Sequence, residues 1–275
     1  MNTTDTSATS KLIAHQKSAC LASLLILSLT ACGDKDPQTE PSSKAIAAPT
    51  ELIFEDRAEA TGFVFEHFSG QTGNHYMPEI MSAGIALLDV DNDDDLDIFV
   101  LQGRDLDPEV EGDGMIEGVE PGHRLFRNEI NPTGELTFTD VSESSGIDDR
   151  GYGMGLAVGD IDNDGDQDIY LAHYGENYLY LNDGDGSFTD ITASSGTGDD
   201  RFGSSTAFLD YDSDGLLDLY VANYNNFTVS NHQSCNTVTG EQDYCDPLAY
   251  PPAVDRIFRN LGDGKFVDTA RETGV

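Results

Sequence analysis

The chain has 275 residues, with 51 acidic and only 14 basic side chains, which gives a formal net charge of -37. This charge excludes nucleic acid as a partner and disfavours direct electrostatic docking on anionic lipid. The 13 Phe and 11 Tyr residues, with many Ile, Leu and Val residues, argue against disorder and for a packed core.

An export signal is predicted at the N-terminus. Lys11 and Lys17 precede the apolar run ACLASLLILSLTAC, which is too short for a stable transmembrane helix and is typical of a secretory signal. The run ends in LTAC, which resembles the lipobox of bacterial lipoproteins, where the cysteine is acylated and becomes the mature N-terminus. Residues 1–31 are therefore predicted to be a lipoprotein signal peptide and Cys32 the lipidated residue, with a plain cleaved signal or an uncleaved anchor as alternatives.

The predicted domain order depends on this signal. Residues 32–51 are polar and rich in Pro, Ser and Thr, as in a flexible tether, and residues 52–275 form the folded part. We expect an exported protein that is lipid-anchored to a bacterial membrane, on its periplasmic face or at the cell surface. The lipid is then its only membrane contact.

An acidic stretch, DVDNDDDLD, places six carboxylates in the nine positions 89–97. It is either a solvated acidic loop or the shell of a bound cation. Related stretches recur at 160–168 and 210–218, giving the pattern D-x-D-x-D-G-x-x-D. Each lies between two short apolar runs rich in β-branched and aromatic residues, so each is predicted to join the two strands of a hairpin.

Two further elements come after each hairpin. RLFRN (124–128), YLYLN (178–182) and RIFRN (256–260) are predicted third strands, and Phe-led segments beginning at 138, 188 and 266 are predicted fourth strands. The acidic stretches begin at 89, 160 and 210, so they are 71 and 50 residues apart. Four-stranded units repeated in this way predict an all-β protein, a β-propeller with one blade per repeat.

Calcium is the predicted ligand of the acidic loops. Alternate side chains of D-x-D-x-D converge when the backbone curls, the glycine at position six permits a positive φ, and the aspartate at position nine closes the shell. A backbone carbonyl at position seven and water would complete it. Because every donor is a hard oxygen, Ca2+ is favoured over zinc or copper, although acidic turns without a fixed ion remain the alternative. The predicted ligands are Asp89, Asp91, Asp93 and Asp97; Asp160, Asp162, Asp164 and Asp168; and Asp210, Asp212, Asp214 and Asp218.

The first loop departs from the pattern, because Asp94 replaces the glycine at position six. Aspartate tolerates the left-handed conformation better than most residues, so the site is retained. Cys235 and Cys245 are predicted to form a disulfide in an oxidising compartment, with a pair of free thiols as the alternative. No histidine shows a metal-binding spacing, so we expect hydrogen-bonded structural histidines.

These motifs resemble those of FG-GAP/VCBS repeat proteins, and within them the bacterial relatives of cartilage acidic protein, the ASPIC/UnbV group. The resemblance is carried by MPEIMSAGIALLDVDNDDDLDIFV, GLAVGDIDNDGDQDIYLAHY, FLDYDSDGLLDLYVANY, LYLNDGDGSFTDIT and the insertion with the two cysteines. It implies an integrin-like propeller with calcium in its blade loops, exported from the cell.

The resemblance also implies missing parts. Phe54-Glu55-Asp56, with Thr61-Gly62 after it, matches a fourth-strand segment that no other strands of its blade precede. About three blades and an orphan strand cannot close a ring, so we expect further C-terminal blades and the ASPIC/UnbV domain to be missing, with a partner chain that completes the ring as the alternative.

Two functions are compatible with the sequence. The first is a calcium-stabilised binding or adhesion module for a protein or glycan, and no nucleophile-base set is visible that would argue otherwise. The alternative is a secreted polysaccharide-active or other calcium-dependent propeller enzyme. A pocket that gathers Arg, Lys, His or Tyr around an exposed ion would favour the enzyme.

Overall fold

The computed structural model describes residues 54–71, 73–81, 83–106 and 122–275. The predicted signal peptide and tether, and with them Cys32, lie outside the described residues. Phe54–Val275 is one compact unit. Within the described ranges, no helix has the length and apolar character needed to cross a membrane.

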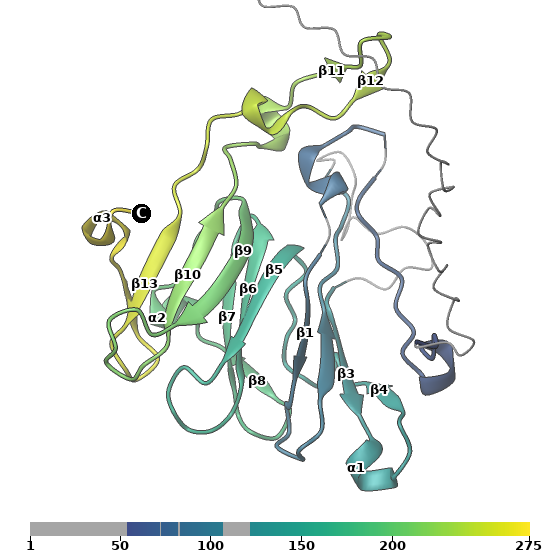
Figure 1. Cartoon of the computed structure of the whole chain (residues 1–275), viewed down its shortest axis with the longest axis vertical. Helices are drawn as coiled ribbons and strands as arrows, with labels where there is room; N and C mark the ends of the chain where they lie inside the picture. Colours follow the sequence, from purple (N-terminus) through teal and green to yellow (C-terminus); the bar gives the residue numbers. More distant parts are fainter. Residues whose placement is uncertain (1–53, 72, 82, 107–121) are drawn as a thin grey trace, which may run out of the picture. The chain divides into compact units, whose positions relative to one another are not determined.

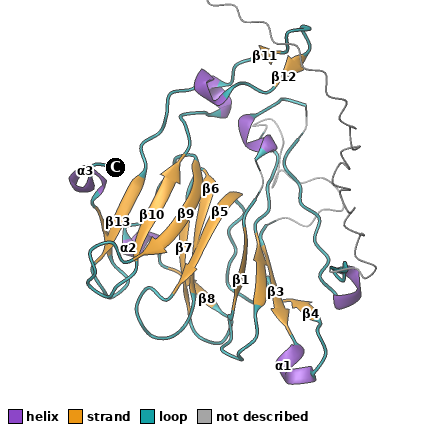
Figure 2. Cartoon of the chain, viewed as in Figure 1, coloured by secondary structure: helices purple, strands orange, loops and turns teal. Residues whose placement is uncertain are grey.

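The unit is built around three antiparallel sheets of four strands each, as the sequence predicts (Figure 2). The first contains β1 (Ile85–Leu88), β2 (Asp97–Val100), β3 (Arg124–Asn128) and β4 (Phe138–Asp140). The second contains β5 (Tyr152–Gly159), β6 (Asp168–Tyr174), β7 (Tyr178–Asn182) and β8 (Phe188–Asp190). The third contains β9 (Gly203–Leu209), β10 (Asp218–Asn223), β13 (Arg256–Asn260) and β14 (Phe266–Asp268).

Strand register explains why the acidic loops are hairpin tips. In the first sheet Leu88 pairs with Asp97, so the loop starts directly after β1 and its last aspartate is the first residue of β2. The second and third sheets repeat this, with Gly159 opposite Asp168 and Leu209 opposite Asp218. The Asp at position nine is therefore both a loop residue and a ladder residue.

Neighbouring sheets pack face to face through their first strands, β1 against β5 and β5 against β9 (Figure 1). Alternation along each strand places one set of side chains between two sheets. The core between the first and second sheets includes Leu88, Phe99, Leu125, Leu171 and Tyr180. The core between the second and third includes Tyr170, Leu179, Leu219, Val221 and Phe258.

The sheets do not close into a ring, which fits an incomplete propeller. On β1, Leu88 is fully buried against the second sheet, whereas Ile85 and Leu87 are 63% and 60% exposed. The face of the first sheet that points away from the second is therefore open at β1, whereas Phe63 covers Phe126 of β3 on the same face.

The expected orphan strand differs from the prediction, because Phe54–Asp56 forms no strand. A strand needs a partner for its backbone groups, and no third strand lies beside this segment. The turn after it is nevertheless placed as in a blade. Gly62, with φ 83°, packs against the carbonyl of Phe138 in β4, as Gly146 packs against that of Phe188 in β8.

The remaining elements are short. The 3-10 helices are η1 (Glu59–Thr61), η2 (Met77–Ile80), η3 (Val229–Asn231) and η4 (Pro247–Ala249). The α-helical turns are α1 (Ile130–Thr133), α2 (Thr192–Ser195) and α3 (Ala270–Thr273). Between β10 and β13 an insertion carries the small hairpin of β11 (Cys235–Asn236) and β12 (Gln242–Asp243).

The insertion contains the predicted disulfide. Cys235 and Cys245 are bonded, with their Cα atoms 5.2 Å apart. Cys245 is buried in an aromatic cluster that includes Tyr76, Phe202, Phe227 and Tyr250. The bond thus ties a loop with little regular structure to a packed core.

Candidate metal centres

The three acidic loops lie at one end of the sheets, and the insertion with β11 and β12 lies at the other (Figure 1). The topology requires this, since each loop joins the first two strands of its sheet. We refer to residues 89–97, 160–168 and 210–218 as the first, second and third loops and number their positions one to nine.

The carboxylate at position one folds each loop back on itself. Its two oxygens accept the backbone N–H groups of positions five and six, at 3.0–3.1 Å in all three loops. In the second loop, Asp160 accepts from Asp164 and Gly165. Backbone dipoles thereby offset part of the charge of this carboxylate.

The carboxylate at position nine connects the loop to the third strand of its sheet through hydrogen bonds. Asp97, Asp168 and Asp218 are fully buried. One oxygen of each accepts the N–H of position two at 2.8–3.0 Å. The other accepts the N–H of the asparagine that ends the third strand, at 2.7–2.9 Å. Position nine is therefore a structural residue in its own right, and each oxygen keeps a lone pair for a further partner.

Carboxylate oxygens from positions one, three and nine converge in every loop, with the ligand atoms within 4.8 Å of one another. These groups are Asp89, Asp91 and Asp97; Asp160, Asp162 and Asp168; and Asp210, Asp212 and Asp218. The predicted ligands at position five are not part of them. One oxygen of Asp93, Asp164 and Asp214 instead accepts the N–H of position seven at 2.9–3.0 Å, and their role as ligands stays a prediction.

The carboxylate at position three lacks a full set of partners. Oδ1 of Asp91 and Oδ1 of Asp162 are buried, and no hydrogen-bond partner for them is found among the described residues. Burial raises the pKa of both carboxyls, and the charges of their neighbouring aspartates raise it further. A buried carboxylate oxygen without a partner is costly, so the loops are electrostatically incomplete.

The donor set fits a hard divalent cation. All converging atoms are carboxylate oxygens, with no imidazole or thiolate among them. Burial also raises the pKa of Asp97 to about 6 and that of Asp168 to about 7, although two backbone N–H groups lower each of them. A cation bound between the carboxylates would favour their ionised forms and reverse these shifts.

The loop backbone is left-handed at position six in all three loops. Asp94 has φ 68°, beside 102° for Gly165 and 90° for Gly215, so the departure of the first loop from the pattern leaves its turn intact. Position four is left-handed as well, at φ 58° for Asn92 and 61° for Asn163, which the sequence motif did not predict. Asparagine at this position was the available signal, because it tolerates positive φ.

Asparagine side chains connect neighbouring loops, a role that was missed from the sequence. Asn92 of the first loop donates to Asp166 of the second at 2.7 Å, and Asn163 of the second donates to the position-six carbonyl of the third at 3.2 Å. From the third strands, Asn182 and Asn260 donate to the position-two carbonyl of the preceding loop, at 3.1 and 2.7 Å. The recurring Asn at the end of YLYLN and RIFRN was the signal.

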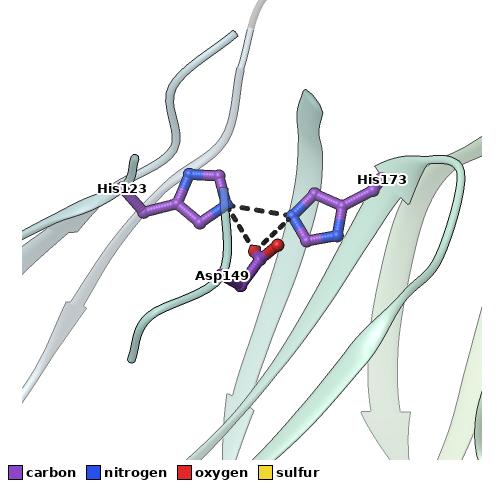
Figure 3. Close-up of side chains that lie close together, drawn as sticks. All are labelled: His123, Asp149 and His173. Carbon is purple, nitrogen blue, oxygen red and sulfur yellow. Dashed lines mark hydrogen bonds and ion pairs between the residues drawn. The ribbon is translucent and has the colours of Figure 1, made fainter. Parts of the chain in front are cut away.

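A different group of potential metal ligands lies at the opposite end of the sheets (Figure 3). His123 precedes β3, Asp149 lies between β4 and β5, and His173 belongs to β6, and all three are buried. Oδ2 of Asp149 is 2.8 Å from Nε2 of His123 and 3.1 Å from Nε2 of His173. The two Nε2 atoms are 3.0 Å apart.

The outer ring nitrogens show where the protons lie. Nδ1 of His123 accepts the backbone N–H of Gln102 at 2.9 Å, so the ring carries its proton on Nε2 and donates it to Asp149. Nδ1 of His173 is 2.8 Å from the carbonyl of Glu176 and donates to it, so its Nε2 donates to Asp149 only as the second N–H of a positively charged ring. A metal on Nε2 of His123 would require a proton on Nδ1, where the Gln102 N–H already points. The group therefore forms a hydrogen-bonded network in this structure.

The polar atoms of this network are paired within the protein. Oδ1 of Asp149 accepts the N–H of Gly151 at 2.7 Å, so every polar atom of the three side chains has a partner. Burial acts to raise the pKa of Asp149, but the hydrogen bonds from His123 and His173 outweigh it and hold this pKa well below its ordinary value.

Comparison with known families supports the repeat. A family model described as an FG-GAP-like repeat matches residues 160–221, which include the second and third loops and the strands between them. No curated protein matches the chain. The FG-GAP-like repeat and the four-stranded sheets together indicate a module of the propeller or adhesion type.

Proposed function

We propose that this chain is a calcium-binding β-propeller module, exported and lipid-anchored through Cys32, that binds a protein or a glycan. The FG-GAP-like repeat and the stacked sheets support the module. One observation carries the assignment of calcium. At position three, Oδ1 of Asp91 and of Asp162 is buried without a partner, in each case beside two other converging carboxylates.

In this proposal calcium makes the stacked sheets stable. Each loop is connected to the next through the asparagines at position four and at the ends of the third strands. Repulsion within one loop therefore acts on its neighbours as well. A divalent ion in each loop neutralises the aspartates and holds the hairpin tips in the spacing at which the sheets pack.

Calorimetric titration of the chain with Ca2+ tests this function. We expect calcium binding at affinities typical of extracellular modules, on the order of 0.1 to 1 mM or tighter. Asp162→Asn should abolish binding to the second loop. Asp185→Asn is the matched control, because Asp185 is an aspartate of the nearby 182–188 turn that belongs to no converging group. Absence of calcium binding in the unmodified chain would refute the proposal.

The enzyme alternative has less support. A hollow of about 330 Å³ is lined by His123, Arg124, Asp149 and Arg150, among others, but it lies at the end of the sheets opposite the acidic loops. None of its lining residues belongs to an acidic loop. The basic groups of this hollow are therefore not gathered around a proposed ion site, as catalysis with a bound ion would require.

The lipid anchor needs a separate experiment. Cells that express the chain are grown with a labelled fatty acid, and the purified protein is examined for the label. The unmodified chain should be labelled and should fractionate with membranes, whereas Cys32→Ser should be neither. Equal labelling of both chains would refute the assignment of Cys32.

A further inference from the structure

One strand position beside the loops carries a different residue in the second sheet than in the first and third sheets. The role that we propose for it rests on the calcium sites proposed above. It is the fourth residue of the third strand, which is Arg127 in β3, Leu181 in β7 and Arg259 in β13. The third strand ends beside its own loop, since its last residue donates to position nine. The side chain just before that point is therefore close to the acidic group.

In the third loop, the guanidinium of Arg259 forms an ion pair with the position-three carboxylate. Its Nε lies 2.7 Å from Oδ2 of Asp212, and its Nη2 lies 3.5 Å from Oδ2 of Asp214. Asp212 is one of the three converging carboxylates. Arg259 therefore supplies a positive charge at the place where a cation would bind.

In the second loop, the corresponding residue is Leu181, whose side chain packs against the core between the second and third sheets. Among the described residues, no Lys or Arg side chain forms an ion pair with the aspartates of this loop. Oδ1 of Asp162 is the buried oxygen without a partner. Among the described residues, no basic side chain takes the place of a cation in the second loop.

The first loop is intermediate. Arg127 donates to Oε1 of Glu129 from Nε at 3.2 Å and from Nη2 at 2.9 Å. Its Nε lies 4.0 Å from Oδ2 of Asp91, at the limit of an ion pair. This arginine is thus held mainly by a glutamate outside the loop.

We propose that the fourth residue of the third strand grades the cation affinity of the three loops. The second loop, with Leu181, binds the ion most tightly, the third loop, with Arg259, binds it most weakly, and the first lies between. The reason is competition, because an ion at the third loop must displace the guanidinium from Asp212 or bind beside it. At a separation of about 5 Å, repulsion between a unit charge and a divalent ion weakens binding about tenfold even in bulk water.

Calcium titration of single-residue variants of the full chain tests this order. Asp162→Asn should remove the tightest binding event and Asp212→Asn the weakest. Arg259→Leu should tighten the weakest event about tenfold, and Leu181→Arg should weaken the tightest by a similar factor. Because Leu181 is part of the core, Arg259→Leu is the decisive variant, since its side chain is 44% exposed and its loss leaves the packing intact.

Two controls separate local from general effects. Arg259→Lys keeps the charge and should leave the affinities within about threefold of the unmodified chain. Arg271→Leu removes the same charge from the exposed surface of α3, away from the loops, and should change no binding event. If Arg259→Leu and Arg271→Leu behave alike, or if all three loops bind equally, the graded affinities are refuted and calcium binding stands. If no variant binds calcium, the proposed function itself fails.

Discussion

Buried acidic groups lie at both ends of the sheets, but their charge is compensated differently at the two ends. At the insertion end, Asp149 receives hydrogen bonds from two histidines, and its pKa lies well below the ordinary value. At the loop end, Asp97 and Asp168 are equally buried beside other carboxylates, and their pKa values are raised to about 6 and about 7. Burial raises the pKa of all three carboxyls, but only at Asp149 do hydrogen bonds outweigh it, whereas at Asp97 and Asp168 two backbone N–H groups offset it only in part.

The difference explains why we propose ion sites at only one end. The network of His123, Asp149 and His173 is complete, because each polar atom has a partner within the chain. The loops are incomplete, because the position-three oxygens of Asp91 and Asp162 are buried without one. We therefore expect the two ends to be energetically independent and only the loop end to respond to calcium.

The largest effect is expected at the insertion end. Asp149→Ala leaves two buried histidines without their shared acceptor and should lower the free energy of unfolding by about 3–5 kcal/mol. Asp148→Ala, at the exposed neighbouring position, should cost less than about 0.5 kcal/mol. Urea denaturation with and without Ca2+ measures both. A loss for Asp149→Ala that calcium restores would contradict the independence of the two ends.

The disulfide should rank next. Replacing Cys235 and Cys245 by serine opens a short loop and should lower the free energy of unfolding by about 2–3 kcal/mol in the chain-entropy model. Because the bond belongs to the insertion end, the loss should be the same in calcium and in EDTA. A loss seen only in EDTA would mean that the bond and the loops support the same part of the fold.

The loop end should show a distinct pH dependence in EDTA. The raised pKa values of Asp97 and Asp168 mean that the folded state binds protons more strongly than the unfolded state. Their stabilising contribution is therefore complete below about pH 4 and is lost as the pH rises through about 6 to 7. Burial lowers the pKa of His123, and this contribution makes stability rise with pH up to about 6.5, so the comparison between EDTA and calcium isolates the aspartates. Stability in EDTA, measured by thermal melting, should fall relative to that in saturating Ca2+ as the pH rises through this window. A difference between EDTA and calcium that stays constant from pH 4 to 7 would contradict the raised values.

The smallest effect concerns the turn of the first loop. Asp94 has φ 68° where the other two loops have glycine. Asp94→Gly should relieve the left-handed strain and one like charge, raising the free energy of unfolding in EDTA by up to about 1 kcal/mol. Asp263→Gly is a control with the same backbone change at φ 52° in the turn after β13. If Asp263→Gly raises the free energy of unfolding and Asp94→Gly does not, the charge at position 94 does not strain the loop.

Much of the fold could be predicted because it repeats. The third strands 124–128, 178–182 and 256–260 have the predicted bounds, since apolar alternation and turn residues recur in each unit. The disulfide could be inferred from the two cysteines that lie outside the predicted signal peptide and lipobox. Phe54–Asp56 shows the limit of pattern matching, because its sequence matches a strand whose partner is absent from the described residues.

The site could be predicted only in part. The spacing of D-x-D-x-D indicates that the carboxylates of positions one and three lie together, as they do in the structure. It does not show that the carboxylate of position five accepts a hydrogen bond from the backbone N–H of position seven. The network of His123, Asp149 and His173 joins three segments that are far apart in the sequence, and no local pattern indicates it. The contrast between Arg259 and Leu181 was visible in the sequence, but its meaning required the distance to Asp212.

Thermal melting of the full chain in EDTA and in saturating Ca2+ tests the central claim most directly. If divalent ions compensate the converging aspartates, calcium should raise the melting temperature by several degrees, consistent with about 2.7 kcal/mol for one site at a hundredfold excess over Kd. Asp91→Asn with Asp162→Asn should remove most of that rise. Identical melting temperatures in EDTA and in calcium would contradict the account.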